Sequence, residues 1–128
     1  MLKYLLIALG GASGSVARYW LSVTIQERFA TMLPVGTIMV NVLGSFFIGV
    51  AFTLLKSRVG NPEIIGAFVI VGLLGGFTTF SAFSLETLGL IEAGFWYKAL
   101  INVAVSVLCC VGAAYLGISA GTLVVKTF

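Results

Sequence analysis

The chain contains four long apolar segments, and few folds other than a bundle of membrane-spanning helices can accommodate them. The segments cover residues 2–24, 35–55, 64–91 and 96–125. Each can cross a bilayer, because a spanning helix needs about 20 mainly apolar residues. The separators are short and polar, and Pro34 and Pro62 are each placed to open the next helix. We expect one domain over residues 1–128, an all-α membrane protein with four transmembrane helices at about 2–25, 33–56, 63–91 and 96–125.

The composition supports a multi-pass membrane protein and excludes several classes of function. Hydrophobic residues make up 60% of the chain and charged residues only 9%. The chain has no His and no Asp, so the usual general bases and metal ligands of hydrolases are missing and we do not expect an enzyme. Most of its basic residues stand at helix ends rather than in a cluster, so we expect a lipid bilayer and no nucleic acid as a partner.

The basic residues give little information on orientation. Four helices place both termini on one side of the membrane, and that side carries Lys3, Lys56, Arg58 and Lys126. The opposite side carries Arg28 and Lys98, and Arg18 as well if it lies near that face. The positive-inside rule therefore has little bias to act on, and the sequence predicts insertion in both orientations.

The third apolar segment contains a stretch that does not suit an unbroken helix. Residues 72–86 read GLLGGFTTFSAFSLE, and Gly75 and Gly76 each lower helix propensity by about 1 kcal/mol. Hydroxyl and aromatic residues follow at once, so we expect a break at mid-membrane. Irregular backbone at that depth needs protein or a wet cavity to satisfy its polar groups, which makes the break a candidate ion or substrate site.

Uncharged polar residues form two stripes with helical spacing. The second segment carries Thr37, Asn41 and Ser45, and the fourth carries Asn102, Ser106 and Cys110. Such stripes either hold helices together through hydrogen bonds or line a shared pathway. A third stripe, made of Phe77, Phe80 and Phe83, is by itself more typical of packing than of function.

The first segment places Arg18 one turn after Gly14. With Gly10 and Gly11, Gly14 allows close approach of a neighbouring backbone. An arginine at this depth is costly, so its charge either reaches the interface as an anchor or faces a wet cavity and attracts anions.

Three motifs together resemble the Fluc (CrcB) family of small fluoride channels. They are GGASG at 10–14 with Arg18, then GT at 36–37 with Val40, Asn41 and Gly44, then GGFTTFS at 75–81. The resemblance covers all four segments. It implies an antiparallel, dual-topology homodimer with two pores in the bacterial inner membrane. Its implied function is passive export of cytoplasmic fluoride, which gives fluoride resistance.

The same resemblance implies roles for particular residues. A structural Na⁺ at the dimer centre is expected on the backbone carbonyls of Gly75 and Thr78. The fluoride pore is expected to involve Asn41, Phe80, Phe83, Ser81, Thr37, Ser106, Thr79 and, near a vestibule, Arg18. Hydroxyl and amide groups suit a strongly hydrated anion because they donate hydrogen bonds, and the positive edge of a phenyl ring adds a weaker attraction. Ala82 departs from the family, which usually has Thr at this position.

Two other functions remain as alternatives. A small proton-coupled multidrug exporter requires a membrane-embedded carboxylate, but the segment 2–24 has no acid and Glu86 lies near the far end of the third segment. A structural membrane subunit without transport leaves the double glycine followed by TTFS without an explanation.

Overall fold

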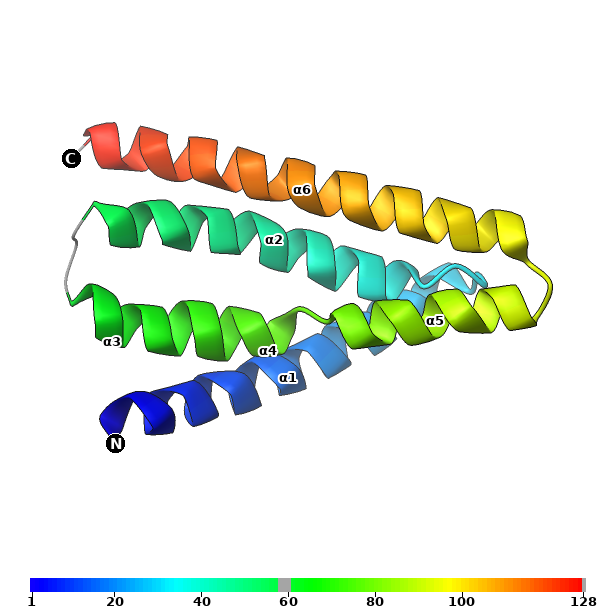
Figure 1. Ribbon diagram of the computed structural model, residues 1–128, viewed down its shortest axis with the longest axis horizontal. Helices are drawn as coiled ribbons and strands as arrows, with labels where there is room; N and C mark the ends of the chain where they lie inside the picture. The colour runs from blue at the N-terminus through cyan, green and yellow to red at the C-terminus, as the bar shows by residue number, and fades with distance from the viewer. Residues whose placement is uncertain (58–60, 128) are drawn as a thin grey trace.

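The computed structural model is all-helical and describes residues 1–57 and 61–127 (Figure 1). Its elements are α1 (Leu2–Phe29), α2 (Val35–Lys56), α3 (Pro62–Gly66), η1 (Ala67–Leu74), α4 (Gly75–Phe77), α5 (Phe80–Glu92) and α6 (Trp96–Thr127). Arg58, counted above on the side of the termini, lies outside the described residues.

Among the described residues, three helical stretches are long and apolar enough to cross a membrane. They are Val35–Lys56, Pro62–Glu92 and Trp96–Thr127. The helix α1 is the fourth long helix of the chain and continues past its expected end near residue 25 to Phe29. The two termini lie at the same end of the molecule (Figure 1).

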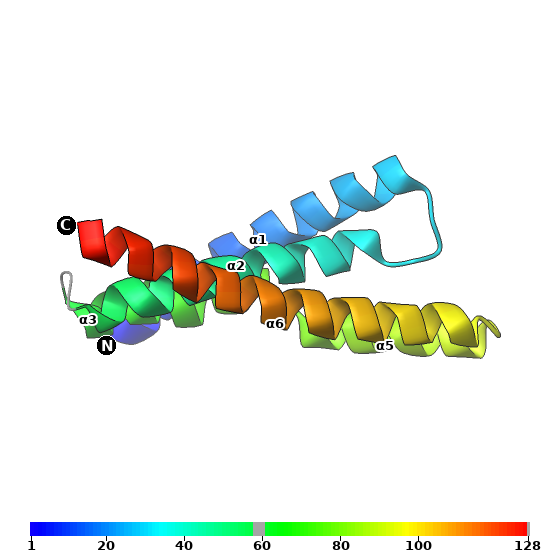
Figure 2. The ribbon, with the colours of Figure 1, turned by 90° about the horizontal axis from the view of Figure 1, so that it is seen from above.

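The helices form two main packing pairs. The first pair is α2 with α6, and the second is α1 with the stretch η1–α4. Figure 2 shows that the second half of α1 diverges from the other helices. The stretch η1 is a π-helix, a wide-turned form that is uncommon and frequently found near functional sites.

Glycines allow both pairs to approach closely. A Cβ on Gly14 would meet the carbonyl oxygen of Leu73, and a Cβ on Gly76 would lie 2.6 Å from that of Gly11. In the other pair, a Cβ on Gly49 would meet the Ala114 carbonyl oxygen. Small residues at such crossings are typical of helix packing in membranes, where van der Waals contact rather than water exclusion drives association.

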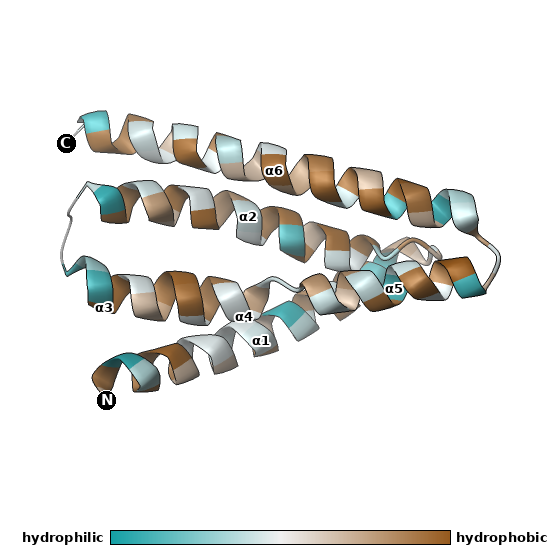
Figure 3. Cartoon of the chain, viewed as in Figure 1, coloured by the Kyte–Doolittle hydropathy of each residue, from teal (hydrophilic) through white to brown (hydrophobic). Residues whose placement is uncertain are grey.

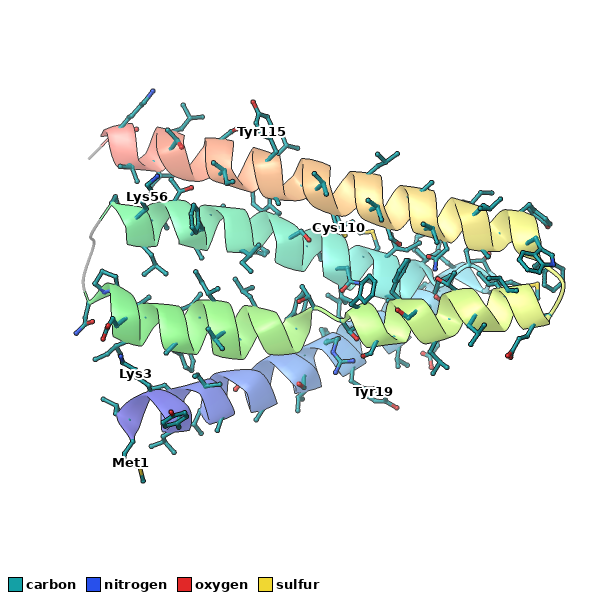
Figure 4. The ribbon with its side chains drawn as sticks, viewed as in Figure 1. Met1, Lys3, Tyr19, Lys56, Cys110 and Tyr115 are labelled. Carbon is teal, nitrogen blue, oxygen red and sulfur yellow. The ribbon has the colours of Figure 1, made fainter. Side chains whose placement is uncertain are left out.

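The buried core of the chain is small, and its outer surface is largely apolar. Val40 and Asn102 are the largest fully buried side chains. Along α6, large apolar side chains are exposed, with Leu108 at 72% and Tyr115 at 69%. Most of each helix is hydrophobic, with hydrophilic residues at helix ends and also midway along α1 and α2 (Figure 3), and Lys3 and Lys56 lie at the end that holds the termini (Figure 4). This pattern suits a chain surrounded by lipid or by another copy of itself.

Candidate functional site

The helical stretch that begins at Pro62 is interrupted at two residues. The helix α4 ends at Phe77, and α5 begins at Phe80. Between them, Thr78 and Thr79 have extended backbones, with φ/ψ of −86°/157° and −152°/116°. The Thr79 side chain caps α5 by accepting a 3.2 Å hydrogen bond from the Ala82 N–H.

The carboxamide of Asn41 completes the hydrogen bonding of the interruption. From α2, its Oδ1 accepts from the Thr79 N–H at 2.7 Å, and its Nδ2 donates to the Thr79 carbonyl at 3.0 Å. Both backbone groups of an extended residue are thus satisfied by one side chain. Irregular backbone in a low-dielectric environment requires such compensation.

These bonds remove the helical donors of two carbonyls. In an α-helix the Gly75 carbonyl would accept from the Thr79 N–H, which instead donates to Asn41. The Thr78 carbonyl would accept from the Ala82 N–H, which instead donates to the Thr79 hydroxyl. The two carbonyls that lose their donors are those that the resemblance assigns to Na⁺. Carbonyl oxygens of unwound backbone are suitable ligands for such a cation, so the residues present fit the ion.

The Gly76 carbonyl, which lies between those of Gly75 and Thr78 along the chain, is bound by side chains of another helix. The Gly76 oxygen accepts from Arg18 Nε at 3.1 Å and is 3.5 Å from the Ser15 hydroxyl, both on α1. Arg18, which the resemblance places near a vestibule, therefore lies against the interruption. Its contact with a backbone carbonyl is one of the usual ways to stabilise a charge within a helical membrane protein.

A cavity of about 350 Å³, here called the polar groove, adjoins the interruption. Its lining consists of Asn41, Ser45, Ile48, Thr78, Thr79, Phe80, Phe83, Ser106, Val107, Cys110 and Val111. Five predicted pore residues are therefore brought together from α2, α5, α6 and the interruption itself. The Phe80 and Phe83 rings lie 5.3 Å apart between centroids, and Phe80 is 77% exposed.

A second cavity of about 440 Å³, here called the Glu86 cavity, lies among α1, α2 and α5. The Thr37 hydroxyl donates to Glu86 Oε1 there at 2.7 Å. The other carboxylate oxygen, Oε2, is buried and has no hydrogen-bond partner among the described residues. Thr37, predicted as part of the pore, thus lines this cavity rather than the polar groove.

The polar stripe of α6 takes part in packing as well as in the groove. Asn102 is fully buried and donates to the Thr87 hydroxyl on α5 at 2.8 Å. Ser106 donates to the Asn102 Oδ1 at 3.4 Å and also lines the polar groove. Asn102 therefore joins α6 to α5, and Ser106 and Cys110 of the same stripe line the polar groove.

The polar groove and the interruption lie within a segment that matches a known family. The family model described as CrcB-like protein, Camphor Resistance (CrcB), matches residues 5–118. The chain belongs to the CrcB family. Two relatives named "Fluoride-specific ion channel FluC" support the assignment. That of Magnetococcus marinus is 52% identical over 118 residues, or 92% of this chain and 96% of the relative. That of Shewanella denitrificans is 48% identical over 117 residues, or 91% and 94%.

CrcB membership confirms two expectations from the sequence. The relatives are named as ion channels, and this confirms the expectation that the chain is not an enzyme. With several apolar helices, this CrcB protein is a multi-pass membrane protein, consistent with a bacterial inner membrane.

The structure of this CrcB chain also shows supporting residues that the sequence did not single out. Ser15 shares the Gly76 carbonyl with Arg18. Gln26 donates to the carbonyls of Thr31 and Leu33 and accepts from the Gly36 N–H, so it fixes the turn that leads into α2. Both are common polar residues without a distinctive spacing.

Ser81, predicted as part of the pore, is exposed, and its hydroxyl lies 3.2 Å from that of Thr79.

Proposed function

We propose that this CrcB protein is a fluoride channel that lets cytoplasmic fluoride leave passively and thereby gives fluoride resistance. The names of the relatives support a fluoride channel. The observation that carries the proposal is the polar groove, in which an amide, hydroxyls and two phenyl rings meet beside a helix interruption. Because the relatives are named as channels, we prefer this function to the multidrug exporter.

The chemistry of the polar groove suits a small, strongly hydrated anion. Asn41 Nδ2 carries two hydrogens and donates one to the Thr79 carbonyl, so the second remains available to donate to an anion. The hydroxyls of Ser45 and Ser106 offer further donors, and the edges of Phe80 and Phe83 are weakly positive. None of the described residues that line the groove is charged. Weak, neutral contacts favour conduction, because an ion must leave each site as readily as it enters.

A single chain offers only part of such a channel. The polar groove is open on the side of Phe80, which is 77% exposed. The carbonyls of Gly75 and Thr78 provide two oxygen ligands, fewer than a bound cation normally takes. We therefore infer an antiparallel homodimer, inserted in both orientations, in which two copies close two pores. The interruption would then lie near the middle of the membrane, and α1 would act as a fourth span.

The same dimer accounts for a structural Na⁺. Two copies would supply the carbonyl oxygens of Gly75 and Thr78 twice, at the point where the interruptions face each other. When bound, the ion supplies a positive charge that balances these carbonyl dipoles. The neighbouring side chains keep the carbonyls available, since Asn41 and Thr79 bind the amides that would otherwise occupy them.

Fluoride efflux from liposomes tests the proposed function. Purified protein is reconstituted, and release of trapped fluoride is compared with release of trapped chloride and with protein-free liposomes. We expect fast fluoride release and slow chloride release. Fluoride release no faster than in protein-free liposomes would refute the proposal.

A further inference from the structure

Three neighbouring carbonyls at the interruption have different surroundings. Those of Gly75 and Thr78 lose their helical donors to Asn41 and Thr79. The Gly76 carbonyl, one of the two that separate them along the chain, receives donors from Arg18 and Ser15 on α1. Successive carbonyls in a helix point about 100° apart around its axis, so within α4 fixing the Gly76 carbonyl also fixes the direction of the Gly75 carbonyl. Thr78 follows this turn directly, with an extended backbone.

We propose that Arg18 is a positioning residue for the cation site. By binding the Gly76 carbonyl, Arg18 holds α4 in one rotation against α1. This rotation directs the Gly75 carbonyl away from α1 and toward the cation, and it fixes the end of α4 from which the extended Thr78 continues. Ser15 assists on the same oxygen. The inference rests on the cation site of the proposed function and assigns Arg18 a role other than attraction of anions.

The packing around Gly76 supports this role. A Cβ on Gly76 would lie 2.6 Å from the Gly11 carbonyl oxygen, and a Cβ on Gly14 would meet that of Leu73. The two backbones are therefore close together at Leu73 and at Gly76. At this separation, the Arg18 guanidinium reaches the Gly76 carbonyl directly, at 3.1 Å from Nε, in a partly buried hydrogen bond.

The choice of arginine has a physical reason. Its Nε–H lies in a rigid, planar group and can donate to one carbonyl while the remaining N–H groups stay available. A donor that carries a charge makes a stronger hydrogen bond than a neutral one. Lysine keeps the positive charge but lacks the planar group. The Arg18→Lys variant therefore weakens positioning of the carbonyl while it keeps the electrostatic attraction of anions.

The test is a sodium titration of the purified dimer. Choline chloride is replaced by sodium chloride at constant ionic strength, and the midpoint of thermal unfolding is followed. An ion that binds only the folded dimer stabilises it by RT ln(1 + [Na⁺]/Kd), so the wild-type midpoint should rise with the logarithm of the Na⁺ concentration above the dissociation constant, which the fit provides. In Arg18→Lys, this dissociation constant should rise about tenfold, the size expected for one lost charge-assisted hydrogen bond. Ser15→Ala should raise it less, since the Ser15 hydroxyl lies farther away, at 3.5 Å.

A matched control is available on the same helix. Arg28 is in the last turn of α1 and is exposed, so Arg28→Lys makes the same chemical change away from the interruption and should leave the dissociation constant for Na⁺ unchanged. General destabilisation lowers the unfolding midpoint at every Na⁺ concentration without changing this dissociation constant. If Arg18→Lys binds Na⁺ with the same dissociation constant as the wild type, the inference is overturned. If that variant does not fold, an unchanged dissociation constant in Ser15→Ala would overturn it.

The outcome also separates this inference from the proposed function. Stabilisation by Na⁺ without fluoride efflux would refute the channel and leave the positioning role standing. Fluoride efflux from a wild-type protein whose stability does not respond to Na⁺ would leave the channel and overturn the role of Arg18.

Discussion

The polar groove and the Glu86 cavity are similar in size but differ in chemistry. The groove has a volume of about 350 Å³ and a lining of neutral donors and phenyl rings. The cavity has a volume of about 440 Å³ and contains a carboxylate with one buried, partnerless oxygen. In the proposed channel, a fluoride ion would gain from the first environment and would be repelled by an ionised group in the second. Two cavities with polar linings can thus differ in how they would treat an anion.

Both cavities border the same helix. Thr79, at the start of α5, lines the groove, and Glu86 lines the cavity. Thr79, Ala82 and Glu86 follow the spacing of one helix face, so position 82 lies between the two environments. Substitutions in the groove, at position 82 and at Glu86 therefore test whether the two environments differ in function.

The largest effect is expected for Asn41→Leu. The substitution keeps the volume but removes both hydrogen bonds to Thr79, and each buried backbone group left without a partner costs about 1–3 kcal/mol. We expect fluoride efflux to fall by more than about a hundredfold, with a lower thermal stability of the dimer. The control is Ser45→Ala, which changes the same groove without touching the interruption. Similar efflux in Asn41→Leu and Ser45→Ala would contradict the role of Asn41.

The next effect is expected for Phe80→Ile. Isoleucine keeps an apolar side chain in the groove but lacks the polarised ring edge. We expect efflux to fall by about tenfold or more, while the fraction of dimer measured by size exclusion stays the same. Phe46→Ile is the matched control, since this ring pairs with Phe47 on α2 and does not line the groove. Unchanged efflux in a well-folded Phe80→Ile protein would assign the phenylalanine stripe to packing.

A smaller effect of opposite sign is expected for Ala82→Thr. A hydroxyl here would extend the donor row that begins at Thr79, and one neutral hydrogen bond is worth about 0.5–1.5 kcal/mol. The initial efflux rate at matched protein density should therefore rise about two- to tenfold. Stability should change little, because the N–H of residue 82 keeps its bond to the Thr79 hydroxyl. Equal rates in the two proteins would remove position 82 from the anion path.

The smallest effect is expected for Glu86→Gln. Glutamine keeps an acceptor for the Thr37 hydroxyl and removes a negative charge that lies outside the polar groove. We expect efflux to change by less than about threefold, with any change upward because repulsion of the anion is reduced. A large loss would place the carboxylate on the transport path. Proton-driven uptake of an organic cation that disappears in Glu86→Gln would then support the multidrug exporter.

Much of the site could be predicted from residue types and spacing. The double glycine followed by TTFS indicated an interruption, and the helices α4 and α5 are separated at Thr78 and Thr79. Local propensity indicated a break in this region and the threonine that caps α5, although Gly75 and Gly76 are themselves helical and the break follows them. The even spacing of Thr37, Asn41 and Ser45, in contrast, suggested one continuous track. Over eight residues a helix rises about 12 Å, enough for this stripe to reach different neighbours, namely Glu86, Thr79 and the polar groove.

The sequence by itself determined the apolar segments, the interruption and the neutral donors, because hydrophobic length and backbone propensity are local properties of the chain. Only the tertiary structure decided which backbone groups at the interruption are satisfied and by which side chains. Asn41 reaches Thr79 from α2, and Arg18 reaches Gly76 from α1. A hydrogen bond between segments this far apart depends on how the helices pack, and the close approach at Gly11 and Gly14 sets that packing.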